Sequence, residues 1–74
     1  MKKSWLEFTV IEDTGKTKKW SVTNKSTRVF VGQVKWYGGW RRYAFFTDAD
    51  MLFDADCLRE IADFLEQQMN DRKI

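Results

Sequence analysis

Residues 34–46 read Val-Lys-Trp-Tyr-Gly-Gly-Trp-Arg-Arg-Tyr-Ala-Phe-Phe, two strand-like runs on either side of a glycine pair. Glycine adopts the positive φ that tight hairpin turns require, so Gly38 and Gly39 predict a hairpin in which Trp36 lies opposite Arg41. Successive strand side chains point to opposite faces. One face then receives Val34, Trp36, Tyr43 and Phe45, and the other receives Lys35, Tyr37, Trp40, Arg42 and Ala44. The first set is suited to a core, whereas the second combines cations with aromatic rings.

The period of two extends over most of the chain. Four runs are expected to be strands, and they cover residues 5–11, 18–23, 29–37 and 41–46. Gly32 lies inside the third run, which indicates a bulge or the close approach of another group. The connections are short and rich in turn-forming residues, so the strands are predicted to form an antiparallel meander.

The pattern then changes to that of an amphipathic helix. Asp54 is a suitable N-cap, and we expect the helix at about residues 55–69. Its apolar stripe comprises Leu58, Ile61, Ala62 and Leu65, widened by Phe64 and Met69. Cys57 falls in the first turn, where a helix N-terminus is expected to lower the pKa of a thiol.

These elements predict an α+β fold of two layers, a four-stranded antiparallel meander with one C-terminal helix, in a single domain over 1–74 with its sheet at about 5–47. One helix covers one sheet face, which we expect to hold Leu6, Phe8, Val10, Trp20, Val22, Val34, Trp36 and Phe45. The other face is left with Lys19, Lys35, Tyr37, Trp40 and Arg42, together with Trp5 and Ile11. An uncovered aromatic face of this kind usually has a partner.

Charge is distributed unevenly along the 74 residues. Residues 1–47 hold ten cations and three acids, while residues 48–74 hold eight acids and three cations. Such a dipole can steer a charged partner. The single cysteine excludes an intramolecular disulfide and fits a reducing cytosol, and no stretch has the length and apolarity of a membrane span. We therefore expect a cytoplasmic protein with no membrane partner.

Catalytic chemistry has little support in the sequence. The chain has no histidine, which excludes Ser-His-Asp and Cys-His nucleophiles, and it has no glycine-rich phosphate loop and no zinc-ligand spacing. The acids Asp48, Asp50, Asp54 and Asp56 do not fit a calcium loop, because Phe53 and Arg59 stand where that loop needs glycine and glutamate. We expect no catalytic residue, no metal and no cofactor.

The predicted site lies on the uncovered face and comprises Lys19, Lys35, Tyr37, Trp40 and Arg42. Its rings can stack on bases while its cations meet phosphate, which favours binding of nucleic acid or a nucleotide. The alternative is that Tyr37 and Trp40 only clasp the hairpin as a cross-strand pair, with the lysines protecting strand edges and maintaining solubility.

Two segments carry a resemblance to known proteins: residues 32–46, with the core Trp-Tyr-Gly-x-Trp-Arg-x-Tyr, and residues 53–65. Over about residues 20–69 the chain resembles small uncharacterised proteins scattered through phages and prophages. This resemblance implies a phage accessory protein, a class that often inhibits a host defence protein or sequesters its nucleotide signal. The strand-strand-strand-helix order is also similar to the DNA-binding domains of phage integrase arms and plant ethylene-response factors, which place a sheet in the major groove.

A rival interpretation is a protein–protein inhibitor of a host protein or a homo-oligomeric module. Its contact surface is either the same sheet face or the acidic helix face, which comprises Asp56, Glu60, Asp63 and Glu66. The acidic face can also be simply solvated, and the third interpretation is a scaffold domain with no ligand of its own.

Overall fold

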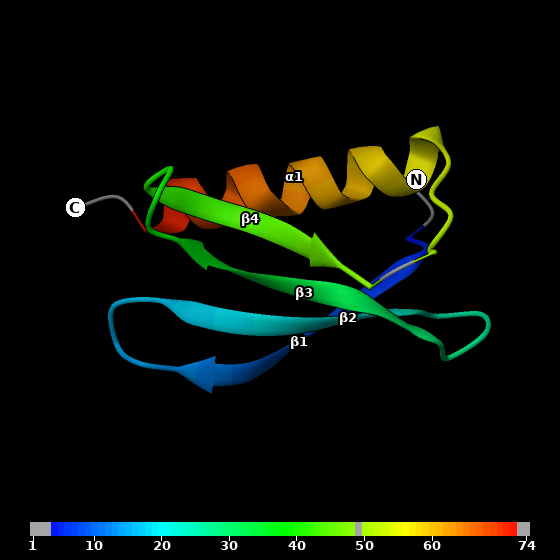
Figure 1. The fold of residues 1–74 in the computed structure, drawn as a ribbon, viewed down its shortest axis with the longest axis horizontal. Coiled ribbons are helices and arrows are strands. Elements are labelled where there is room, and N and C mark those ends of the chain that lie inside the picture. The colour runs from blue at the N-terminus through cyan, green and yellow to red at the C-terminus, as the bar shows by residue number, and fades with distance from the viewer. Residues whose placement is uncertain (1–3, 49, 73–74) are drawn as a thin grey trace.

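The computed structural model describes residues 4–48 and 50–72. Its elements are β1 (Leu6–Asp13), β2 (Lys18–Asn24), β3 (Phe30–Tyr37), β4 (Arg42–Thr47) and α1 (Ala55–Asp71). The strands form one antiparallel sheet in the order β1-β2-β3-β4, and α1 packs against one face of it (Figure 1). The predicted meander with a C-terminal helix is therefore confirmed.

The core lies between α1 and the inner face of the sheet. Its buried side chains are Leu6, Trp20, Val22, Val31, Val34, Tyr43 and Ile61. Phe64 of α1 stacks on Phe8 with ring centroids 4.0 Å apart and meets Trp20 edge-on at 5.1 Å. Aromatic rings bury a large apolar area per residue, which suits a domain too small for a deep core.

The helix stripe is rotated from the one expected. Leu58 is 53% exposed and Ala62 is also exposed, whereas Phe64, Leu65 and Met69 pack against the core around Ile61. Val10 was expected beneath the helix but is largely exposed, because β1 diverges from α1 along its length (Figure 1). Trp5 was expected on the open face, and it packs against the core instead.

The β3–β4 hairpin has a longer turn than predicted. Trp36 pairs with Tyr43 and Tyr37 with Arg42, so four residues, 38–41, form the turn. The positive φ of this turn belongs to Arg41, at 54°, and not to either glycine. The expected pairing of Trp36 with Arg41 is therefore wrong by two residues. A shift by two preserves the side-chain faces, because strand side chains alternate with a period of two.

Gly32 meets both expectations for a glycine inside a strand. The β2–β3 register shifts next to it, between Val22 and Thr23, which marks a bulge. A methyl group on Gly32 would lie 2.8 Å from Cζ of Phe45 and would also overlap the carbonyl oxygen of Phe46. The sheet closes tightly around this position, and only glycine fits it.

The two edges of the sheet differ. On β4, the backbone N–H of Tyr43 donates to Sδ of Met69 at 3.4 Å, so α1 covers part of that edge. On β1, Val10 and Ile11 are exposed, and the register shifts between Val10 and Glu12, which places a bulge at Ile11. Bulges are one way in which proteins protect an open edge from pairing with another chain.

Candidate nucleic-acid interface

The outer surface of the β3–β4 hairpin carries a cluster that we call the hairpin face: Lys35, Tyr37, Trp40, Arg42 and Phe46. Tyr37 is its centre, with ring centroids 5.0 Å from Trp40 and 6.3 Å from Phe46, both in edge-on arrangements. Lys35, Tyr37, Arg42 and Phe46 project from the strands, while Trp40 extends from the turn. The structure therefore brings four of the predicted site residues together.

Phe46 was missing from the predicted site. Alternation along β4 places it on the same side as Arg42, so the signal was present in the sequence. The rings of the hairpin face are open to solvent, and Trp40 is the most exposed of them at 66% of its surface. The indole is therefore available to a partner, although its contact with Tyr37 also fits the clasp interpretation.

The charge of the hairpin face is positive and unbalanced. Residues 30–47 contain three cations and no acid. The Lys35 ammonium lies 4.5 Å from the centroid of the Phe46 ring, a cation–π contact. Arg42 is exposed directly opposite Tyr37, and no carboxylate of the described residues pairs with its guanidinium.

Lys19 does not join this cluster as a free cation. It lies on β2, and its Nζ is 3.3 Å from a carboxylate oxygen of Glu12 on β1. The pair is partly exposed, so its contribution to stability is small, but the charge of Lys19 is locally balanced. Lys19 is therefore a weaker candidate for phosphate than Arg42.

The four acids of the helix do not form one uniform surface. Glu60 faces the start of β1, where Oε1 accepts from the Trp5 N–H at 2.8 Å and Oε2 accepts from the Ser4 hydroxyl at 2.6 Å. Asp56 pairs with Arg59 at 2.9 Å. Asp63 and Glu66 are exposed. Glu60 and Asp56 are thus among the acids of α1 that interact with other groups of the chain.

The start of α1 is capped as predicted, but its thiol behaves differently from expectation. The Cys57 N–H donates to Oδ1 of Asp54 at 2.9 Å, and this bond lowers the pKa of Asp54. The pKa of Cys57 is raised, mainly because partial burial disfavours the thiolate and secondarily because Asp54 is nearby. The expected lowering of the Cys57 pKa is therefore wrong, and the thiol is a poor nucleophile at neutral pH.

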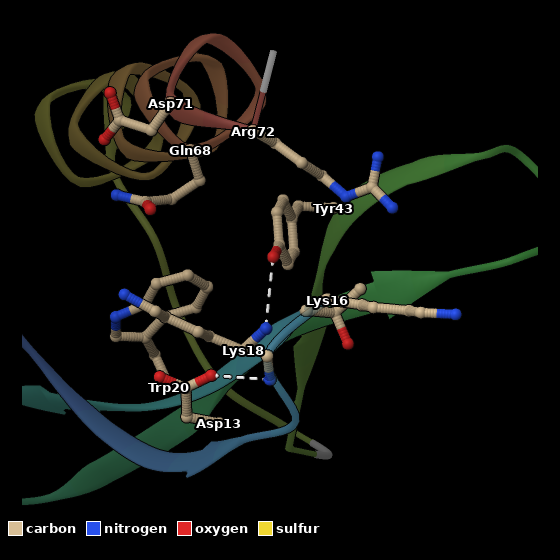
Figure 2. Close-up of a pocket in the computed structure, with 10 residues that line it drawn as sticks. Asp13, Lys16, Lys18, Trp20, Tyr43, Gln68, Asp71 and Arg72 are labelled. Carbon is tan, nitrogen blue, oxygen red and sulfur yellow. Dashed lines mark hydrogen bonds between the residues drawn. The ribbon is translucent and has the colours of Figure 1, made fainter. Parts of the chain in front are cut away.

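A pocket of about 540 Å³ opens on the helix side of the sheet, between the end of α1 and the β1–β2 turn (Figure 2). Its lining residues are Asp13, Gly15, Lys16, Thr17, Lys18, Trp20, Tyr43, Gln68, Asp71 and Arg72. The Tyr43 hydroxyl accepts from the Lys18 N–H at 3.1 Å and stands at the middle of the pocket (Figure 2). This pocket could not be predicted from local sequence patterns, because the turn and the helix end are far apart in the chain.

The pocket mixes both signs of charge, with Lys16, Lys18 and Arg72 beside Asp13 and Asp71. Figure 2 shows Lys16 and Arg72 extending to the same side of Tyr43 with their charged ends apart from each other, so these cations do not converge on a single point. The Arg72 guanidinium lies 4.0 Å from the centroid of the Trp36 ring. The hairpin face, where the positive charge is unbalanced, is therefore the stronger candidate for an anionic ligand.

Comparison with known proteins places the chain among phage proteins. It is 34% identical over 70 residues to the uncharacterised 9.3 kDa protein of Acholeplasma phage L2, and the match covers 93% of this chain and 90% of the relative. The chain belongs to the family of that phage protein. No protein-family model and no solved structure matches this member of the phage family.

Two further findings concern the described part of the phage protein. No group of three or more His, Cys, Asp or Glu side chains is placed to hold a metal ion among the residues that the structure describes. No helix within residues 4–48 and 50–72 has both the length and the apolar character needed to cross a membrane.

Proposed function

We propose that this phage protein is a non-enzymatic accessory protein that binds nucleic acid or a nucleotide through the hairpin face. The observation that supports the proposal is the combination of exposed rings with unbalanced positive charge on the sheet face opposite α1. Bases stack on aromatic side chains, and arginine meets phosphate through a fork of N–H donors. Tyr37 and Trp40 supply the rings, and Lys35 and Arg42 supply the positive charge.

The test is binding of a fluorescein-labelled oligonucleotide by anisotropy over a series of salt concentrations. We expect affinity to fall as salt rises, because phosphate contacts release counterions. The Trp40→Ala/Arg42→Ala double variant should lose at least about tenfold in affinity, since one stacked base alone is worth about 1–3 kcal/mol. Circular dichroism checks that the fold is retained.

A matched control removes one exposed apolar residue and one cation elsewhere. Leu52 is 95% exposed and Arg59 is exposed on α1, so the Leu52→Ala/Arg59→Ala variant has the same change in net charge. Its affinity should stay within about twofold of the parent. Equal losses in both double variants, or binding that does not respond to salt, would contradict the proposal.

The homo-oligomer interpretation uses the same face, and its charge argues against self-association. A two-fold contact presents the same patch on both copies. The hairpin carries Lys35, Arg41 and Arg42 and no acid, so two copies would oppose cations with cations. We expect a monomer by size-exclusion chromatography with light scattering. If the parent protein is a dimer and the Trp40→Ala variant is a monomer, the homo-oligomer interpretation is favoured instead.

A further inference from the structure

We infer that the ligand of the hairpin face is single-stranded nucleic acid, with one unstacked base lying on the Trp40 ring and an adjacent phosphate on Arg42. This inference rests on the proposed function and specifies its substrate class. It depends on three features of the hairpin: the exposure of Trp40, the hollow beside it and the chemistry of the groups that project from the face.

Trp40 offers a broad ring surface. The indole is 66% exposed, and its contact with Tyr37 has an angle of 81° between the ring planes. An edge-on contact covers less ring area than a stacked one, so the pair leaves room for a third ring. A planar base is a suitable occupant, since every base has a π-face and stacking tolerates any sequence.

Tyr37 holds the position from which Trp40 extends. Gly39 lies close to the Tyr37 ring, and a methyl group at Gly39 would be 2.8 Å from Cε2 of Tyr37. The Tyr37 ring can therefore lie across the turn only because residue 39 has no side chain. The Trp40 N–H also donates to the Tyr37 carbonyl at 3.2 Å, which fixes the backbone beneath the indole.

A hollow of about 320 Å³ lies between Trp40 and Arg42 and is lined by these two residues. The hollow is shallow and largely open to solvent, so it can border a ligand on one side without enclosing it. A stacking surface and a guanidinium thus border one small space, the arrangement that a single nucleotide needs for its base and its phosphate.

The chemistry of the face favours a single strand over a duplex. In a duplex the faces of the bases are covered by their neighbours, and proteins read the base edges with hydrogen-bonding side chains. The hairpin face presents three rings instead, with Arg42 as its exposed guanidinium. Exposed rings are useful where bases are unstacked, as they are in single strands.

The experiment compares two labelled probes with the full chain at one salt concentration: a twelve-residue oligothymidylate and a twelve-base-pair hairpin duplex. We expect the oligothymidylate to bind at least about tenfold more tightly. The Trp40→Ala variant should lose most of this preference, because the loss of affinity should be larger for the oligothymidylate than for the duplex. The Trp40→Phe variant keeps a smaller ring and should restore part of the single-strand affinity.

The outcomes separate the inference from the proposed function. If the duplex binds as tightly as the oligothymidylate and both depend on Arg42, the proposed function stands and the inference is wrong. Tight oligothymidylate binding that is unchanged in Trp40→Ala also overturns the inference. If thymidine monophosphate competes as strongly as the oligomer, the ligand is a free nucleotide and not a strand, and the inference is wrong. If neither probe binds and thymidine monophosphate does not bind either, both proposals fail.

Discussion

The Glu60 carboxylate of α1 accepts a hydrogen bond from the backbone N–H of Trp5, with Oε1 and N 2.8 Å apart. Its second oxygen accepts from the N–H of Leu6 at 3.3 Å and from the Ser4 hydroxyl. One side chain thus fastens the start of β1 to the helix, across 54 to 56 residues of sequence. The carboxylate accepts from backbone donors at the start of β1, where the strand enters the sheet.

Replacing Glu60 by alanine should therefore destabilise the fold. The Trp5 and Leu6 N–H groups lose a charged acceptor, and such a loss costs about 1–3 kcal/mol. Glu66→Ala is the matched control, because Glu66 is an exposed acid on the same helix and its removal changes the net charge equally. Urea denaturation should show a lower midpoint for Glu60→Ala only. Equal midpoints for the two variants would show that the Glu60 bonds contribute nothing.

Gly32 and Gly38 should respond in opposite ways to alanine. The added methyl at Gly32 would overlap Phe45 and the Phe46 carbonyl, while nothing lies within 4 Å of the corresponding position at Gly38. Overpacking of this kind costs about 1–3 kcal/mol, so Gly32→Ala should lower the thermal midpoint by several degrees. Gly38→Ala should stay close to the parent. A neutral Gly32→Ala would mean that the sheet gives way at the bulge.

Part of the stability of the fold should depend on pH through the ionisation of Asp54. Its pKa is lowered in the folded chain by the bond from the Cys57 N–H, so the carboxylate stabilises the fold above its ordinary pKa of about 4. That contribution is lost as the pH falls from about 4 through the lowered value. Asp54→Asn keeps an acceptor but removes the titration. The stability difference between the parent and this variant should be present at pH 7 and shrink at pH 3, and a constant difference would contradict the assignment.

Cys57 should react slowly with alkylating agents. Partial burial and the nearby Asp54 both raise the pKa of the thiol, so little thiolate is present at pH 7. The rate with iodoacetamide should reach half its maximum at a higher pH in the folded protein than in urea. Asp54→Asn should move that pH downward. If the thiol reacts faster in the folded protein than in urea, the fold lowers the pKa of Cys57 and the prediction is wrong.

The layers and faces of the fold could be predicted because they follow from periods in the sequence. Alternation assigned Val34, Tyr43 and Phe45 to the inner face, and these assignments survive the error in the hairpin register. The prediction of the turn was wrong, because two adjacent glycines suggested a two-residue connection between the strands. The chain instead places Arg41 in the left-handed region, a conformation that local pattern does not reveal.

The site was less predictable, because it depends on contacts between distant segments. Nothing in the sequence around Glu60 shows that its carboxylate meets the backbone at Trp5, or that Lys19 pairs with Glu12. The rotation of α1 that exposes Leu58 is likewise set by how Phe64 packs on Phe8. Helical spacing identifies the residues that could be buried, whereas packing against the sheet determines which of them are buried.

Met69 has a role beyond packing, because its sulfur occupies a backbone donor on the outer side of β4. A further strand would meet the helix at this point of β4, so β1 is the edge that remains more open to another chain. On β1, the extra residue at Ile11 interrupts the ladder that an incoming strand would have to match. Deletion of Ile11 should remove the bulge and make β1 a regular edge strand, and the resulting chain should form fibres more readily.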